Sequence, residues 1–89
     1  MRQCLVVSED WYNAMPRGMV VVMPMTSRLR GIPLHVVVQP PEGGLDVASA
    51  VKIEDIRSVS VERFSTRYGR LSEHSMQEIA KRLRLLLGL

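Results

Sequence analysis

Three short apolar runs, separated by turn-forming residues, occupy the first half of the chain and constrain its fold class. They cover residues 4–7, 19–25 and 34–39, and valine is their commonest residue. Short runs rich in β-branched residues are typical of buried strands, because such side chains pack well on a pleated surface. Pro24, near the end of the second run, is expected to mark where strand pairing stops, because proline has no N–H.

Two shorter candidate strands, residues 48–53 and 56–59, follow around the acidic pair Glu54-Asp55. Strands spaced this closely, with turn residues between them, predict a small antiparallel barrel or sandwich.

The 89 residues are expected to form one domain, residues 1–89, because chains below about 100–150 residues seldom divide into separate cores. A core this small is often supplemented by oligomerisation, so a homodimer is expected.

The sequence pattern changes after Ser72, where apolar residues recur at helical spacing. Ser72 is a good N-cap, and Glu73 places a negative charge in the first turn, where the helix dipole favours it. Gly88 is a typical helix stop. The pattern therefore predicts a C-terminal helix between Ser72 and Gly88. Its apolar stripe consists of Met76, Ile79, Ala80, Leu83, Leu86 and Leu87.

Composition excludes several classes of protein. Apolar residues make up 46% of the chain and charged residues 24%, which excludes bulk disorder. No apolar run approaches the roughly 20 residues that a membrane helix needs, and a cytoplasmic location is expected. Cys4 is the only cysteine, which excludes an internal disulfide framework and a cysteine-built zinc site.

The charged residues favour a phosphate-bearing partner. The net charge is +3, and ten of the twelve cations are arginine, whose planar guanidinium group matches the geometry of phosphate oxygens.

Few residues outside one loop suggest catalytic chemistry. His35 and His74 could supply the base and acid of a ribonuclease-like reaction, but nothing in the sequence brings them together, and we interpret them as surface or half-buried histidines. Cys4 lies in an apolar run and is interpreted as core filling. Glu9-Asp10 and Glu54-Asp55 lack metal-ligand spacing and are interpreted as solvated or capping carboxylates. No metal and no cofactor are expected.

A polar, basic loop follows the second apolar run directly. It contains Thr26, Ser27, Arg28 and Arg30, and Gly31 lets the backbone come close to a ligand. Hydroxyl donors beside arginines make a site for a phosphodiester. From composition alone, a solvated basic loop remains the other interpretation.

Short segments spread along the chain form an ordered set. They are Arg2 with Leu5-Val6-Val7-Ser8, Tyr12-Asn13, Met23-Pro24-Met25-Thr26-Ser27, Arg30-Gly31-Ile32-Pro33, Leu45-Asp46, Ser49-Ala50-Val51, Asp55-Ile56-Arg57-Ser58-Val59, Gly69-Arg70-Leu71-Ser72 and Leu85-Leu86-Leu87-Gly88-Leu89. In this order and with these gaps, the chain resembles the MazF/PemK family of toxin endoribonucleases over nearly its whole length.

The resemblance implies a mainly β fold, a small SH3-like antiparallel barrel of the CcdB/PemK kind with a C-terminal α-helix. It also implies a type II toxin, usually a homodimer, that cleaves single-stranded mRNA without a metal. The expected partners are the RNA substrate, a cognate antitoxin and, through the toxin–antitoxin complex, operator DNA. No membrane partner is implied.

The resemblance also assigns residues. The family's reaction is a transesterification in which a ribose 2′-hydroxyl attacks the adjacent phosphorus. Its two main catalytic residues fall on Arg2 and Thr26, and its RNA-binding positions point to Ser27, Arg28, Arg30 and Arg57. A guanidinium and a hydroxyl would stabilise the negative charge that gathers on the phosphoryl oxygens in the transition state.

The chain departs from the family pattern at its beginning. The family's first strand and following loop are absent, and Gln3 stands where the family has a proline after the arginine. A second hypothesis is therefore a catalytically impaired, truncated homologue that acts as an antitoxin- or nucleic-acid-binding module. A gyrase poison resembling CcdB is a third and weaker option, because the chain ends Leu87-Gly88-Leu89 rather than Trp-Gly-Ile.

Overall fold

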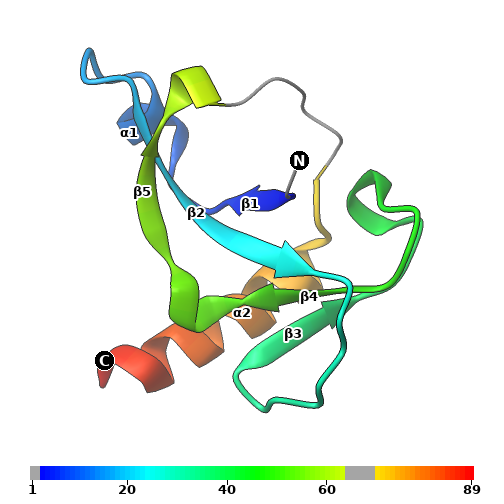
Figure 1. Cartoon of the computed structure of the whole chain (residues 1–89). Coiled ribbons are helices and arrows are strands. Elements are labelled where there is room, and N and C mark those ends of the chain that lie inside the picture. Colours follow the sequence, from blue (N-terminus) through cyan, green and yellow to red (C-terminus); the bar gives the residue numbers. More distant parts are fainter. Residues whose placement is uncertain (1–2, 64–69) are drawn as a thin grey trace.

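One long strand, β2 (Met19–Thr26), organises the sheet in the computed structural model, which describes residues 3–63 and 70–89 (Figure 1). Along one side, β2 pairs antiparallel with β1 (Cys4–Val6). Along its other side, it pairs first with β5 (Arg57–Ser60) and then with β4 (Ser49–Lys52). Strand β3 (His35–Val38) pairs with β4 at the far edge. A single strand thus holds three others in place.

Pro24 lies inside β2, so the prediction that pairing stops there is wrong. The next residue, Met25, donates its N–H to the Gln3 carbonyl at 3.0 Å on the β1 side. Because neighbouring residues of a strand turn their backbone groups to opposite sides, the Pro24 nitrogen faces the other side. There it falls between the segments that pair with β5 and with β4, so the missing N–H costs no ladder hydrogen bond.

Short helical segments connect the strands. Helix α1 (Asp10–Asn13) lies between β1 and β2, in the segment that separates the first two apolar runs. Three 3₁₀ turns follow: η1 (Glu42–Gly44), η2 (Ile53–Asp55) and η3 (Val61–Arg63). The turn η2 joins β4 to β5 directly, so it lies at the point where the sheet changes direction.

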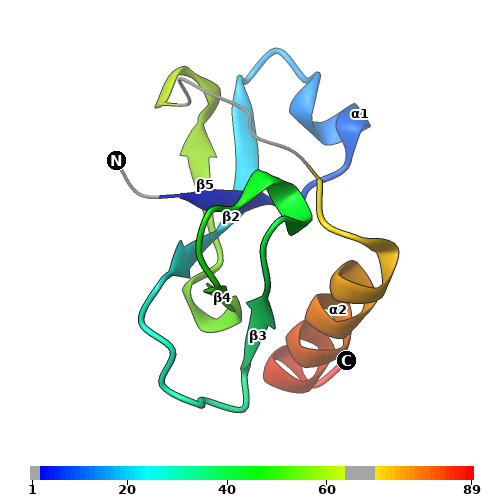
Figure 2. The same cartoon turned by 90° about the vertical axis from the view of Figure 1, so that its right-hand side faces the viewer.

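The C-terminal helix α2 (Glu73–Leu87) packs against β3 and η2 (Figure 2). Ser72 is its N-cap, since the Ser72 hydroxyl accepts a hydrogen bond from the Ser75 N–H at 3.1 Å. Gly88 ends the helix with a left-handed φ of 72°, a conformation that glycine adopts without steric cost. Both predicted ends of the helix are therefore confirmed.

The hydrophobic core lies between the sheet and α2. Its buried members are Met23, Val36, Val38, Leu45, Val51, Ile53 and Ile79. Met76 and Leu83 pack against this cluster, but Ala80, Leu86 and Leu87 of the predicted stripe are exposed. Cys4 is half-buried at the edge of the sheet.

The architecture confirms a mainly β, antiparallel fold with a C-terminal helix. Strand pairing among residues 3–63 and 70–89 does not close the sheet into a complete ring. In the same residues, no helix is long and apolar enough to cross a membrane.

Ile53→Ala is expected to lower the free energy of unfolding by about 2 to 5 kcal/mol, because the side chain is fully buried where η2 meets α2. Val37→Ala is the matched control. Val37 lies on β3 with 47% of its surface exposed, so the loss should stay below about 1 kcal/mol. Denaturant unfolding followed by circular dichroism measures both variants, and equal losses would contradict this packing.

Candidate functional site

Thr26 is the last residue of β2, so the sheet fixes its backbone. The residue is half-buried, and its Oγ1 accepts a hydrogen bond from the Arg28 N–H at 3.1 Å. This local bond holds the start of the basic loop in a turn. The hydroxyl of Thr26 and the backbone of Arg28 are therefore placed together before any ligand binds.

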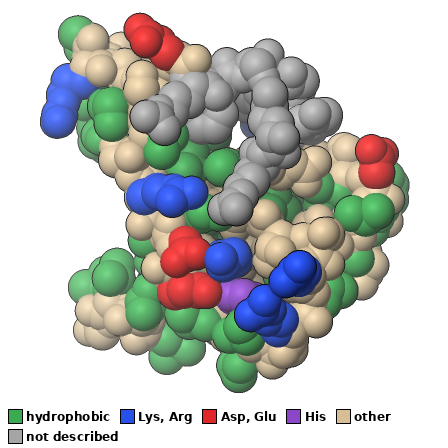
Figure 3. Space-filling model, in the orientation of Figure 1, with side chains coloured by type: hydrophobic (Ala, Val, Ile, Leu, Met, Phe, Trp, Pro, Cys, Tyr) green, Lys and Arg blue, Asp and Glu red, His purple; other side chains and the backbone are tan. Residues whose placement is uncertain are grey.

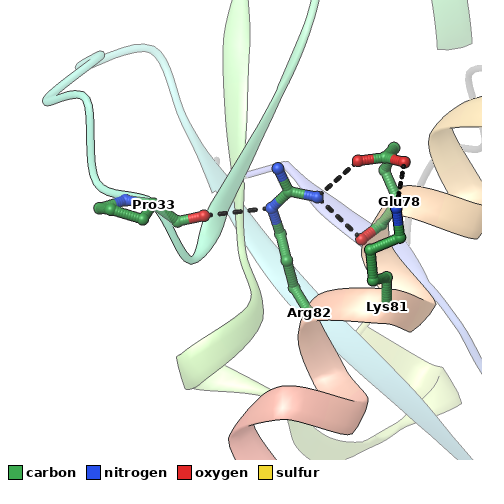
Figure 4. A network of polar contacts seen from close by, with 4 residues as sticks. All are labelled: Pro33, Glu78, Lys81 and Arg82. Carbon is green, nitrogen blue, oxygen red and sulfur yellow. Dashed lines mark hydrogen bonds and ion pairs between the residues drawn. The ribbon is translucent and has the colours of Figure 1, made fainter.

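The far end of the basic loop is tied to helix α2 (Figure 4). Arg82 donates its Nε–H to the Pro33 carbonyl at 3.1 Å. Its Nη1 donates to the Glu78 carboxylate at 2.8 Å and to the Glu78 carbonyl at 3.1 Å. Hydrogen bonds from Arg82, then from Lys81, lower the pKa of the Glu78 carboxyl, which keeps its negative charge opposite these cations. The loop is thus anchored at both ends.

Two adjoining clefts open beside this loop. The small cleft has a volume of about 210 Å³ and is lined by Thr26, Arg28, Arg30, Ile32, His35, Lys52 and Glu54. The large cleft has a volume of about 850 Å³ and is lined by Gln3, Pro24, Met25, Thr26, Ser27, Arg28, Asp46, Val47, Ser49 and Lys52. Thr26, Arg28 and Lys52 line both clefts and so form their shared wall. Figure 3 shows basic, acidic and histidine side chains gathered on one face of the molecule.

A hydrogen-bonded pair, His35 and Glu54, lies in the small cleft. His35 is only 8% exposed, and its Nε2 lies 2.8 Å from Glu54 Oε2. Partial burial raises the pKa of the Glu54 carboxyl, but the hydrogen bonds from His35 and from the Glu54 backbone lower it by more. The net pKa lies below the ordinary value, so the carboxyl is ionised at neutral pH.

These positions correct one interpretation made from the sequence and extend another. His35 is a buried residue, not a surface or half-buried one, because β3 turns its side chain toward the cleft beside η2. Glu54 is exposed, as predicted, and it is also hydrogen-bonded to His35. Asp55, the other half of that acidic pair, lies 2.8 Å from Lys52 Nζ, and the Lys52 hydrogen bond lowers the pKa of its carboxyl.

Sequence reasoning missed Lys52 and assigned no role to the His35–Glu54 pair. The signal that joins them is the strand register, in which His35 is the partner of Lys52 across β3 and β4. Glu54 follows Lys52 by two residues, so the same register brings its carboxylate to His35. Local sequence patterns do not specify this register.

The other predicted site residues fall in three groups. Thr26 and Arg28 line both clefts, whereas Ser27 lines the large cleft and Arg30 the small one. Arg57 is exposed on β5 and lines neither cleft. His74 is exposed in the first turn of α2, and it too lies outside both clefts. The catalytic residue expected at position 2 lies outside the described residues.

Within residues 3–63 and 70–89, no three His, Cys, Asp or Glu side chains are grouped closely enough to hold a metal ion.

Glu54→Gln is expected to lower the free energy of unfolding by less than about 1 kcal/mol at neutral pH, because water screens a side chain that is 35% exposed. The folded-state pKa lies below the unfolded value, so the contribution is present above the unfolded pKa and is lost as pH falls through the folded pKa. Wild type and variant should converge as the pH falls below 4.5. Urea unfolding at several pH values tests this, and a difference that grows on acidification would contradict it.

The similarity to known proteins extends along almost the whole chain. Residues 1–87 match the family described as the PemK-like, MazF-like toxin of type II toxin-antitoxin system. Endoribonuclease MazF9 of Mycobacterium tuberculosis is 33% identical, in an alignment that covers 99% of this chain and 79% of MazF9. The probable endoribonuclease MazF5 of the same organism is 35% identical, over 92% of this chain and 74% of MazF5.

Solved structures show the same fold. MazE–MazF from Deinococcus radiodurans aligns with a TM-score of 0.85 at 28% identity, covering 98% of this chain and 85% of the matched chain. The M. tuberculosis toxin MazF-mt6 aligns with a TM-score of 0.86 at 21% identity, covering 99% and 87%. The family match, the relatives and the fold together place this chain in the MazF/PemK family of toxins of type II toxin–antitoxin systems.

Proposed function

We propose that this toxin is a metal-independent endoribonuclease that binds single-stranded RNA across the two clefts. The observation that carries the proposal is their shared wall, where Thr26 supplies a hydroxyl while Arg28 and Lys52 supply positive charge. An RNA strand that passes from one cleft into the other places a phosphodiester at this wall. Hydroxyl and cationic donors are the groups that bind phosphate oxygens in proteins.

The proposed reaction is a transesterification. The ribose 2′-oxygen bonds to the adjacent phosphorus as its proton leaves, and the bond from phosphorus to the 5′-oxygen breaks. The leaving 5′-oxygen takes up a proton, so the products are a 2′,3′-cyclic phosphate and a 5′-hydroxyl. Arg2 and Thr26 are proposed to stabilise the charge on the phosphoryl oxygens, since donors aimed at that charge lower the barrier. Arg2 is not assigned as the base, because a guanidinium stays protonated at neutral pH.

The proposal extends to partners. A cognate antitoxin is proposed, supported by the MazE–MazF complexes of D. radiodurans, to which this chain is 28% identical. Binding of operator DNA through the toxin–antitoxin complex and a homodimeric toxin are proposed from the family resemblance. Leucines exposed at the end of α2, Leu85 at 74% and Leu87 at 57%, are apolar surface that a protein partner would cover.

Thr26→Ala is expected to slow RNA cleavage by about 100- to 1000-fold, the usual effect of removing one donor to a developing oxyanion. Thr26→Ser keeps the hydroxyl and should retain most of the activity. The assay uses mixed-sequence RNA in EDTA, with fragments analysed for cyclic-phosphate ends. Ser60→Ala, on β5 away from both clefts, serves as the control for a lost hydroxyl.

Two outcomes of the same assay would contradict the proposal. One is cleavage by Thr26→Ala at the wild-type rate. The other is a folded wild-type protein that binds RNA but releases no cyclic-phosphate fragments, which would instead support the non-catalytic binding module. Circular dichroism of each variant shows whether the fold is intact.

Arg28→Ala is expected to weaken binding of single-stranded RNA and to reduce its salt dependence, because Arg28 lines the shared wall. If Arg28 neutralises one phosphate, the slope of log K against log salt should fall by about 0.7. Arg17→Ala, an exposed arginine before β2 and outside both clefts, should leave the slope unchanged. Fluorescence anisotropy across a salt series measures this, and equal slopes in all variants would exclude the loop from the phosphate contacts.

A further inference from the structure

The small cleft has the size and chemistry of a site for one nucleobase. Its volume of about 210 Å³ is enough to admit one nucleobase. Ile32 offers an apolar surface, and the guanidinium groups of Arg28 and Arg30 are planar groups on which a base can stack.

The proposed function puts the RNA backbone at the shared wall, beside Thr26 and Lys52. A base that enters the small cleft from this wall meets the carboxylate of Glu54. Because an ionised carboxylate only accepts hydrogen bonds, it selects bases that present a donor to it.

The direction of the Glu54 carboxylate is fixed by His35. The 2.8 Å hydrogen bond joins Oε2 to a ring that is almost completely buried, so the carboxylate is held in position before RNA arrives. A carboxylate oxygen accepts more than one hydrogen bond, and the pair therefore retains capacity for a ligand donor. His35 is a positioning residue in this arrangement.

We propose that Glu54, held by His35, makes the small cleft select a base with an exocyclic amino group, cytosine, adenine or guanine, next to the cleaved bond, and disfavour uracil. Each of the three selected bases presents an amino donor that the Glu54 carboxylate can accept. The single N–H of uracil lies between two carbonyl oxygens, which the carboxylate repels. This inference rests on the proposed function, because it assigns a base to the same site.

The test measures base preference separately from cleavage. A short random-sequence RNA pool carrying 2′-fluoro groups cannot be cut, because it lacks the attacking hydroxyl. The pool is bound to wild type and to Glu54→Gln, and the bound RNA is sequenced. In the RNA bound by wild type, uridine at one position should be about tenfold rarer than in the starting pool. Glu54→Gln should largely remove this depletion, because its amide can donate to a uracil carbonyl.

Two controls accompany this measurement. Glu62→Gln makes the same chemical change at an exposed residue outside both clefts and should keep the wild-type preference. His35→Phe should lose the preference, whereas His35→Gln, which can still donate to the carboxylate, should recover part of it. A purely structural role of His35 would lower thermal stability without changing base preference.

The outcomes distinguish this inference from the proposed function. Wild type that cleaves unmodified RNA but shows no depletion of uridine overturns the inference alone. The inference also fails if Glu54→Gln slows cleavage of every sequence equally and leaves the preference unchanged. Wild type that binds with the expected preference but does not cleave supports the base site and contradicts the endoribonuclease proposal. A wild type that binds no RNA overturns both.

Discussion

The pairing of β2 with three strands is the constraint on which the candidate site depends. Its first half is bound to β5 and its last residues to β4, so β2 carries the chain from one part of the sheet to the other. Pro24 lies at the change of partner, where a missing N–H is tolerated. As a result, a strand ladder that pairs Thr26 with Ala50 fixes the Thr26 backbone, which does not depend on a loop that would have to be ordered separately.

The strands and the C-terminal helix could be predicted from the sequence because their signals are local. Valine-rich runs indicate the strands, and Ser72 and Gly88 indicate the ends of α2, since a cap depends on a few neighbouring residues. The pairing around Pro24 does not follow from the sequence, because the cost of its missing N–H depends on which strand lies opposite. Residue types alone mark the loop from Thr26 to Arg30 as a candidate site.

The rest of the site could not be predicted because its contacts join distant segments. His35 is hydrogen-bonded to Glu54, which lies 19 positions away in the sequence. Arg82 donates a hydrogen bond to the Pro33 carbonyl, which lies 49 positions away. Each contact depends on the register of β3 with β4 or on the packing of α2, and neither follows from hydrophobic periodicity. A carboxylate that the sequence indicates to be solvated therefore became part of a cleft.

The division of charge within the two clefts separates the requirements of affinity from those of selectivity. Arg28 and Lys52 at the shared wall attract the RNA backbone, whereas the Glu54 carboxylate lines the small cleft alone and is proposed to act on the base. Arg28 and Arg30 are exposed, and ordering such side chains costs about 0.5 to 1.5 kcal/mol each, offsetting part of their attraction for RNA. The His35–Glu54 pair is already ordered, so its preference between bases carries no comparable cost.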